Sequence, residues 1–223
     1  MLLLIEKYIF YFFLFAIPFQ TRKILWYSSW RFGEWTSISV YATDILLILL
    51  FIFWYFNSCQ QIRNPKLKIL NPFDRLMVLS LSKDKFQILN SIFKNPNFYL
   101  FLVLIISAVS IKNSTDNAIS WFQWAKLLEF SIFYWYLSRY AFIKFGLFNS
   151  FLAILMGGLF QAVIAIVQFL KQSNLGLKYL GESVVNSDLA GIASFYLPNG
   201  DKIIRSYGTT PHPNVLATCL FFA

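Results

Sequence analysis

The residues best suited to chemistry gather in one short stretch, "RSYGTTPHPNVLA", at residues 205–217. It holds the only histidine of the chain, His212, followed by Pro213 and Asn214. Pro213 suits the first position of a helix, since its φ is fixed and its missing N–H would be unpaired there, and Asn214 is a good cap. A residue before proline favours extended backbone, so we expect His212 at the helix N-terminus, where free N–H groups favour a phosphate-like anion.

Arg205 lies seven residues before His212, with Gly208 and Pro211 between them as points where the chain can bend. Arg205 and the helix start can therefore converge on one anion, and a guanidinium binds phosphate oxygens in pairs. A second interpretation stays open at this point. The segment can be a tight loop that returns the chain to a bilayer, with Arg205 at the headgroups and His212 merely exposed.

The composition is that of a membrane protein. The 223 residues are 58% hydrophobic, 20% aromatic and 13% charged, whereas soluble domains carry about 25% charged residues. The net charge of +9 is common in membrane proteins, because Lys and Arg set orientation and meet anionic lipid, so it does not indicate nucleic acid. Cys59 and Cys219 have no metal-ligand spacing, and neither metal nor cofactor is expected.

Apolar runs predict an all-α integral membrane protein, a polytopic bundle in one transmembrane domain over residues 1–223. Five complete spans are expected at residues 2–19, 41–56, 98–111, 119–137 and 147–170. A sixth run begins near residue 215 and is cut off at residue 223, so we expect an incomplete chain.

Charge predicts the orientation of these spans. Residues 57–97 are rich in Lys and Arg, which places this loop and the N-terminus in the cytoplasm, and residues 171–213 then form a periplasmic-side loop. The basic loop is either an amphipathic helix on the inner leaflet or a plain solvated loop.

A few other residues within the spans draw attention. Lys126 and Glu129 are three apart and share a helix face, either as a neutralised pair or as part of a polar pathway. Asp44 is expected near the outer interface, with Arg22 or Lys23 as possible partners. The fifth span carries small residues that admit a close helix neighbour, and its two glutamines share a face; these residues are Gly157, Gly158, Ala162 and Ala165, and Gln161 and Gln168.

Four stretches together resemble the bacterial O-antigen ligase and O-antigen polymerase family of multi-span membrane proteins. They are "AIPFQTRKIL", "SVYATDILLILL", "QFLKQSNLGLKYLGES" and, most specifically, "IRSYGTTPHPNVLA". The resemblance is to the amino-terminal half of such a protein. It implies a multi-pass protein of the bacterial inner membrane.

The implied activity is metal-independent glycosyl transfer from an undecaprenyl-diphosphate-linked glycan to an acceptor glycan, glycolipid or protein. The resemblance also implies that Arg205 contacts the diphosphate. The loop and helix start of the substrate site would then be formed by Tyr207, Gly208, His212, Pro213 and Asn214. The catalytic histidine of the family lies in its carboxy-terminal half, so His212 does not inherit that role, and this part alone is expected to be inactive. The catalytic residues are unknown.

Two other hypotheses remain. One is a transporter or flippase component for an anionic or lipid-linked substrate, suggested by Lys126, Glu129, Asp44 and the two glutamines. The other is an assembly subunit without catalysis. Partners expected in each case include membrane lipid and exclude nucleic acid.

Overall fold

The computed structural model describes residues 2–27, 37–63, 95–186, 189 and 191–223. Of these residues, 68% are helical. They divide into two compact units, which are described separately. Unit 1 comprises Met1–Ile24, Ser39–Tyr55 and Phe145–Ala223, and unit 2 comprises Leu25–Ile38 and Phe56–Lys144.

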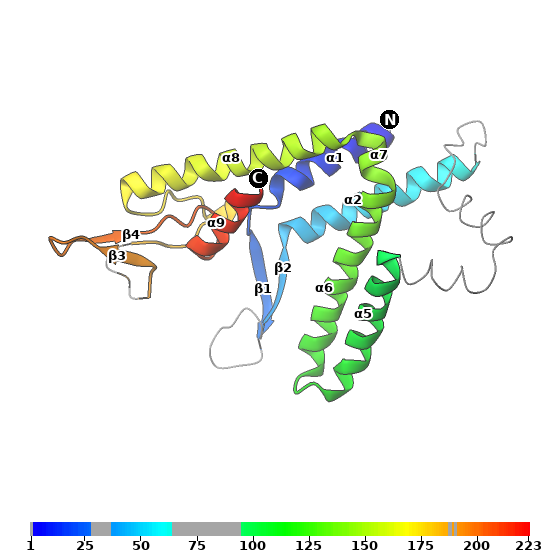
Figure 1. Cartoon of the computed structure of the whole chain (residues 1–223), viewed down its shortest axis with the longest axis horizontal. Coiled ribbons are helices and arrows are strands. Elements are labelled where there is room, and N and C mark those ends of the chain that lie inside the picture. The colour runs from blue at the N-terminus through cyan, green and yellow to red at the C-terminus, as the bar shows by residue number, and fades with distance from the viewer. Residues whose placement is uncertain (1, 28–36, 64–94, 187–188, 190) are drawn as a thin grey trace. The chain divides into compact units, whose positions relative to one another are not determined.

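Unit 1 is organised around the long helix α8 (Leu147–Lys171), which α1 (Leu2–Ala16) and α9 (Pro213–Phe222) accompany (Figure 1). The small residues of α8 allow this packing. A Cβ added at Gly157 would lie 2.4 Å from the carbonyl oxygen of Phe15, and one at Gly158 would lie 2.3 Å from the Cβ of Ala223. The predicted close approach of another helix at these glycines is therefore confirmed.

Between α8 and α9 the chain is ordered into short elements. A 3-10 turn, η5 (Lys178–Leu180), precedes a hairpin of β3 (Ser194–Tyr196) and β4 (Lys202–Ile204). The hairpin is antiparallel, with Ser194 opposite Ile204 and Tyr196 opposite Lys202. Ile204 is buried against Val185 and Tyr207, so the base of the hairpin has a small apolar core.

The beginning of the chain adds a second two-stranded sheet, β1 (Arg22–Tyr27) with β2 (Ser37–Tyr41). Directly after β2 comes α2 (Ala42–Arg63). The protein is mostly helical, in line with the expected all-α fold, and it also contains two small two-stranded sheets. α2 also runs to Arg63, so residues 57–63 are helical where a loop was expected, and residues 64–94 of that loop lie outside the described residues.

Unit 2 contains two neighbouring helices, α5 (Pro96–Ser110) and α6 (Asn117–Tyr136). Each begins with a side-chain cap, from Asn95 and Asp116 respectively. The indole N–H of Trp124 on α6 donates to the carbonyl of Leu104 on α5 at 3.1 Å, and the two helices lie side by side (Figure 1). A 3-10 turn, η3 (Ile111–Asn113), follows α5; a π-helical turn, η4 (Leu137–Ala141), and α7 (Phe142–Phe145) follow α6.

Three of the expected spans are helices long and apolar enough to cross a membrane: Ala42–Cys59, Pro96–Asn113 and Leu147–Lys171. The other two expected spans, at residues 2–19 and 119–137, are not among these helices. α1 has 15 residues, about 22 Å of helix against a hydrocarbon core of about 30 Å, because Pro18 cannot continue it. α6 has 20 residues but carries Lys126 and Glu129. The number of five or six spans therefore stays a prediction, and so does the orientation.

Candidate functional site

α9 begins as the sequence predicts, with Pro213 in its first turn and an extended residue before it. His212 is the N-cap, with φ −152° and ψ 144°, and its Nδ1 accepts the backbone N–H of Asn214 at 3.2 Å. His212 is therefore an exposed cap of α9, while Pro213 is buried.

Arg205 lies beside this helix start. Its guanidinium Nη2 donates to the side-chain Oδ1 of Asn214 at 3.2 Å, on the exposed surface of unit 1. The structure thus brings together Arg205 and the first turn of α9, as the sequence predicts. The N–H groups of Asn214, Val215 and Leu216 are bonded to His212, so what this helix start offers an anion is the Arg205 charge together with the positive end of the helix dipole.

The segment at residues 204–214 is held by one face of α8. Three residues at spacings of four and three line this face, namely Gln161, Ala165 and Gln168, and Gln172, the C-cap residue just after α8, follows them; these four residues are here named the α8 seam. Gln172 Oε1 accepts the N–H of Ile204 at 2.8 Å, and the carbonyl of Ala165 accepts the hydroxyl of Ser206 at 2.7 Å. The seam therefore binds the segment residue by residue.

Gln161 forms the far end of the α8 seam. Its Oε1 accepts the N–H of Thr209 at 3.0 Å, and its Nε2 donates to the hydroxyl of Thr209. The same Nε2 lies 3.4 Å from the carbonyl of Pro18, just after α1. Because Gln161 and Thr209 are both fully buried, these hydrogen bonds form where water does not compete.

Gln168 makes the most contacts of the seam. Its Oε1 accepts the N–H groups of Tyr207 and Gly208 at 3.2 and 2.7 Å, and its Nε2 donates to the carbonyl of Gly208 at 2.9 Å. The same Nε2 donates to Oε1 of Glu182 at 2.7 Å. Both polar atoms of this buried side chain are thus used twice, as buried polar groups require.

Tyr207 and Gly208 have structural places in this site. Tyr207 is buried, and its hydroxyl accepts the N–H of Ala193 at 2.8 Å, so its side chain belongs to the core below the segment. Gly208 has φ +60°, a conformation that glycine adopts readily. An added Cβ there would lie 2.6 Å from Gln161 Oε1 and 2.9 Å from a Leu216 methyl group. Of the six residues predicted for this loop and helix start, Arg205, His212 and Asn214 are the exposed ones.

Sequence reasoning did not connect Gln172, Ser206 or Glu182 with this site. The i, i+7 spacing of Gln161 and Gln168 was the available signal, but it gives a shared face and no partner. Glu182 stands alone in a polar stretch, and nothing in the sequence marks it as buried.

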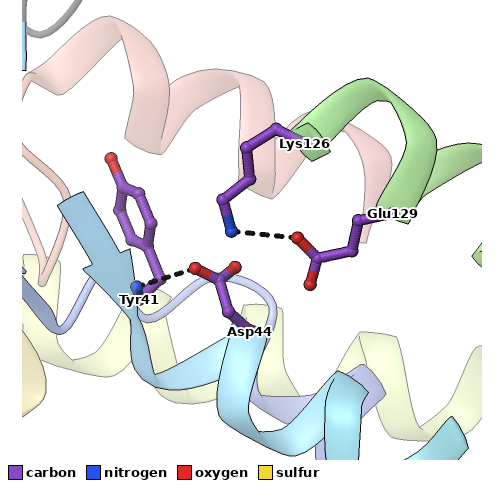
Figure 2. Close-up of polar contacts among 4 residues, drawn as sticks. All are labelled: Tyr41, Asp44, Lys126 and Glu129. Carbon is purple, nitrogen blue, oxygen red and sulfur yellow. Dashed lines mark hydrogen bonds and ion pairs between the residues drawn. The ribbon is translucent and has the colours of Figure 1, made fainter. Parts of the chain in front are cut away.

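The other polar residues noted in the sequence form local pairs. Lys126 Nζ and Glu129 Oε2 are 2.9 Å apart on α6, so the predicted pair is present (Figure 2). Asp44 Oδ2 accepts the N–H of Tyr41 at 2.9 Å at the start of α2, where a carboxylate also meets the positive helix end (Figure 2). Within the described part of the chain, no group of three or more His, Cys, Asp or Glu side chains is placed to hold a metal ion.

Together these features define a class: a mainly helical protein with helices able to cross a membrane, and an exposed Arg–His–Asn group at the start of a further apolar helix. Comparisons with family models, with curated proteins and with solved structures found no match for this chain.

Proposed function

We propose that this protein is, or forms part of, a glycosyltransferase of the O-antigen ligase or polymerase type in the bacterial inner membrane. The donor is an undecaprenyl-diphosphate-linked glycan, and the acceptor is a glycan, glycolipid or protein of the cell surface. The observation that carries the proposal is the arrangement of Arg205 and Asn214 at the N-terminus of α9, on a segment bound to a candidate membrane helix.

The proposed role of Arg205 follows from the chemistry of the transfer. When the acceptor hydroxyl attacks the anomeric carbon, the glycosidic C–O bond to the diphosphate breaks and negative charge grows on the departing phosphate oxygens. A guanidinium already held in place stabilises that charge without reorganisation, so it contributes more to the transition state than to the ground state. The base that takes the acceptor proton is assigned to no residue of this chain.

The structure weakens the case for a transporter or flippase component. Two of its motives, Gln161 and Gln168, are used to hold the 204–214 segment. The ion pair of Lys126 and Glu129, together with Asp44, remains in support of it. Movement of lipid-linked glycan across proteoliposomes without formation of a glycan linkage would favour it.

Binding of undecaprenyl diphosphate to the protein in lipid nanodiscs tests the proposal, with undecaprenyl monophosphate as the comparison ligand. Loss of a charge-assisted, paired hydrogen bond is worth about 1.5–3 kcal/mol, so Arg205→Ala should weaken diphosphate binding roughly 10- to 150-fold. Lys178→Ala removes another exposed cation of the same inter-helix segment and should leave affinity unchanged. Equal affinity of wild type and Arg205→Ala would remove Arg205 from the site.

Glycan transfer in cells forms the second part of the test. The full-length protein with Arg205→Ala should insert normally but fail to transfer glycan, whereas the full-length Lys178→Ala protein should transfer normally. Normal transfer by Arg205→Ala would contradict the proposed role.

A further inference from the structure

Gln168 and Glu182 are a buried, hydrogen-bonded pair of side chains that has no chemical role in the proposed reaction. We propose that Gln168, oriented by Glu182, is a positioning residue that fixes the backbone at Tyr207 and Gly208, and thereby the place of Arg205 at the start of α9. The inference rests on the proposed function, because it assigns Arg205 to an anionic diphosphate.

Glu182 fixes the orientation of the Gln168 amide. Glu182 Oε1 accepts from Gln168 Nε2 at 2.7 Å and from the N–H of Leu175 at 2.6 Å, and its Oε2 accepts the N–H of Leu177 at 2.5 Å. A carboxylate only accepts, so the nitrogen of Gln168 must face Glu182. The oxygen must then face the N–H groups of Tyr207 and Gly208.

Position 168 requires a side chain that both donates and accepts hydrogen bonds. One amide here satisfies two backbone N–H groups and one backbone carbonyl of the opposing segment. Leucine of similar size would leave all of these groups buried without partners. Glutamate would place a carboxylate oxygen against the carbonyl of Gly208 and against Glu182. Only a side-chain amide of this length supplies donor and acceptor together.

Hydrogen bonds hold the backbone before and after Arg205. The N–H of Arg205 donates to the carbonyl of Ala193 at 3.0 Å, and the N–H of Ile204 before it donates to Gln172. Gln168 holds the chain two and three residues after Arg205. The backbone around Arg205 is therefore held on both sides, and its guanidinium reaches Asn214 from a fixed base. Without Gln168, Ser206 and Thr209 still hold the segment after Arg205, but the backbone hydrogen bonds at Tyr207 and Gly208 are lost.

A double-mutant cycle on the full-length protein in nanodiscs tests this inference, with undecaprenyl diphosphate as the probe. Gln168→Leu should raise the Kd about tenfold, in the range of lost charge–phosphate contacts, while the number of bound ligands per protein stays unchanged. In the Arg205→Ala background the same substitution should change Kd by less than about twofold, because coupled residues are not additive. Gln123→Leu, at an exposed glutamine of α6, serves as the matched control.

Several results would overturn the positioning role. These are an unchanged Kd in Gln168→Leu, a fall in bound ligand per protein at unchanged Kd, and an effect that adds fully to that of Arg205→Ala. If Gln168→Leu does not fold, Glu182→Gln replaces it. This variant leaves one acceptor oxygen for the three N–H groups that Glu182 now accepts, so it weakens the orientation of Gln168 and should raise Kd by about threefold or more. An unchanged Kd in Glu182→Gln would likewise overturn the role.

The two proposals fail in different ways. If Arg205→Ala weakens binding and Gln168→Leu does not, the diphosphate site stands and only the positioning role falls. If Arg205→Ala binds undecaprenyl diphosphate as tightly as wild type, the diphosphate site fails, and the positioning role fails with it.

Discussion

Gly208 is the position where a single methyl group should disturb the 204–214 segment most directly. Its φ of +60° lies in the left-handed region, and the direction in which a Cβ would point is occupied. The nearest atoms are Gln161 Oε1 at 2.6 Å and a Leu216 methyl carbon at 2.9 Å. Gly208→Ala therefore combines backbone strain with overlap against both α8 and α9.

The size of the effect follows from these two contributions. An L-residue in the left-handed region costs about 1–2 kcal/mol. Overpacking of a filled interior by a methyl group costs about 1–3 kcal/mol. Gly208→Ala should therefore lower the free energy of unfolding by roughly 2–5 kcal/mol. The overlap also pushes on Gln161, which holds Thr209, so the cost is expected in the upper part of that range.

Gly200→Ala provides the matched control, because Gly200 has φ +90° and an added Cβ there meets nothing within 4 Å. It carries backbone strain without overlap. Thermal unfolding of both variants in the same detergent measures the difference. At about 2–4 °C per kcal/mol for a chain of this size, Gly208→Ala should melt roughly 2–12 °C below Gly200→Ala. Melting within about 1 °C of each other would refute the argument, since about 1 kcal/mol is the least the overlap should cost.

Three further predictions concern other parts of the protein. Gly157→Ala should lower stability by roughly 1–3 kcal/mol, seen as a lower melting temperature, because its Cβ would lie 2.4 Å from the Phe15 carbonyl oxygen; unchanged melting would contradict the close packing of α1 on α8. His212→Ala should cost about 1 kcal/mol through loss of the α9 cap, whereas His212→Asn should retain most of it, and amide exchange at the first turn of α9 would distinguish the two. Lys126→Met should destabilise the protein by about 1–3 kcal/mol, less than for a wholly buried pair because the side chains are 19% and 17% exposed. Adding Glu129→Gln should recover most of this loss. A double variant no more stable than Lys126→Met alone would argue against the ion pair.

The helices were predictable where a long apolar run met no conflicting residue. The run at residues 147–170 corresponds to α8 at Leu147–Lys171, since nothing within it interrupts the helix. The run at residues 2–19 was read as a span because hydrophobicity continues past Ala16, but Pro18 ends the helix earlier. Strand pairing between β3 and β4 carried no comparable signal, because each strand has only three residues.

The candidate site was predictable only in part, for a different reason. The start of α9 is local chemistry, so His212 and Pro213 were enough to indicate it. The supports of the segment are not local, because Gln168 and Gly208 are 40 residues apart. Periodicity identifies a helix face but not what that face contacts, so the α8 seam and Glu182 required the structure.

The pairing of α1 with α8 has a consequence for how the protein is made. Gln161 and Pro18 are 143 residues apart, and α1 finds its place only when the middle of α8 exists. At about 5–20 residues per second, the ribosome needs roughly 7–30 s to synthesise the intervening chain. During that time a short first helix, with Glu6 among its buried residues, has emerged without the neighbour it later packs against. The packing of α1 on α8 is therefore a late event in the synthesis of this stretch of chain.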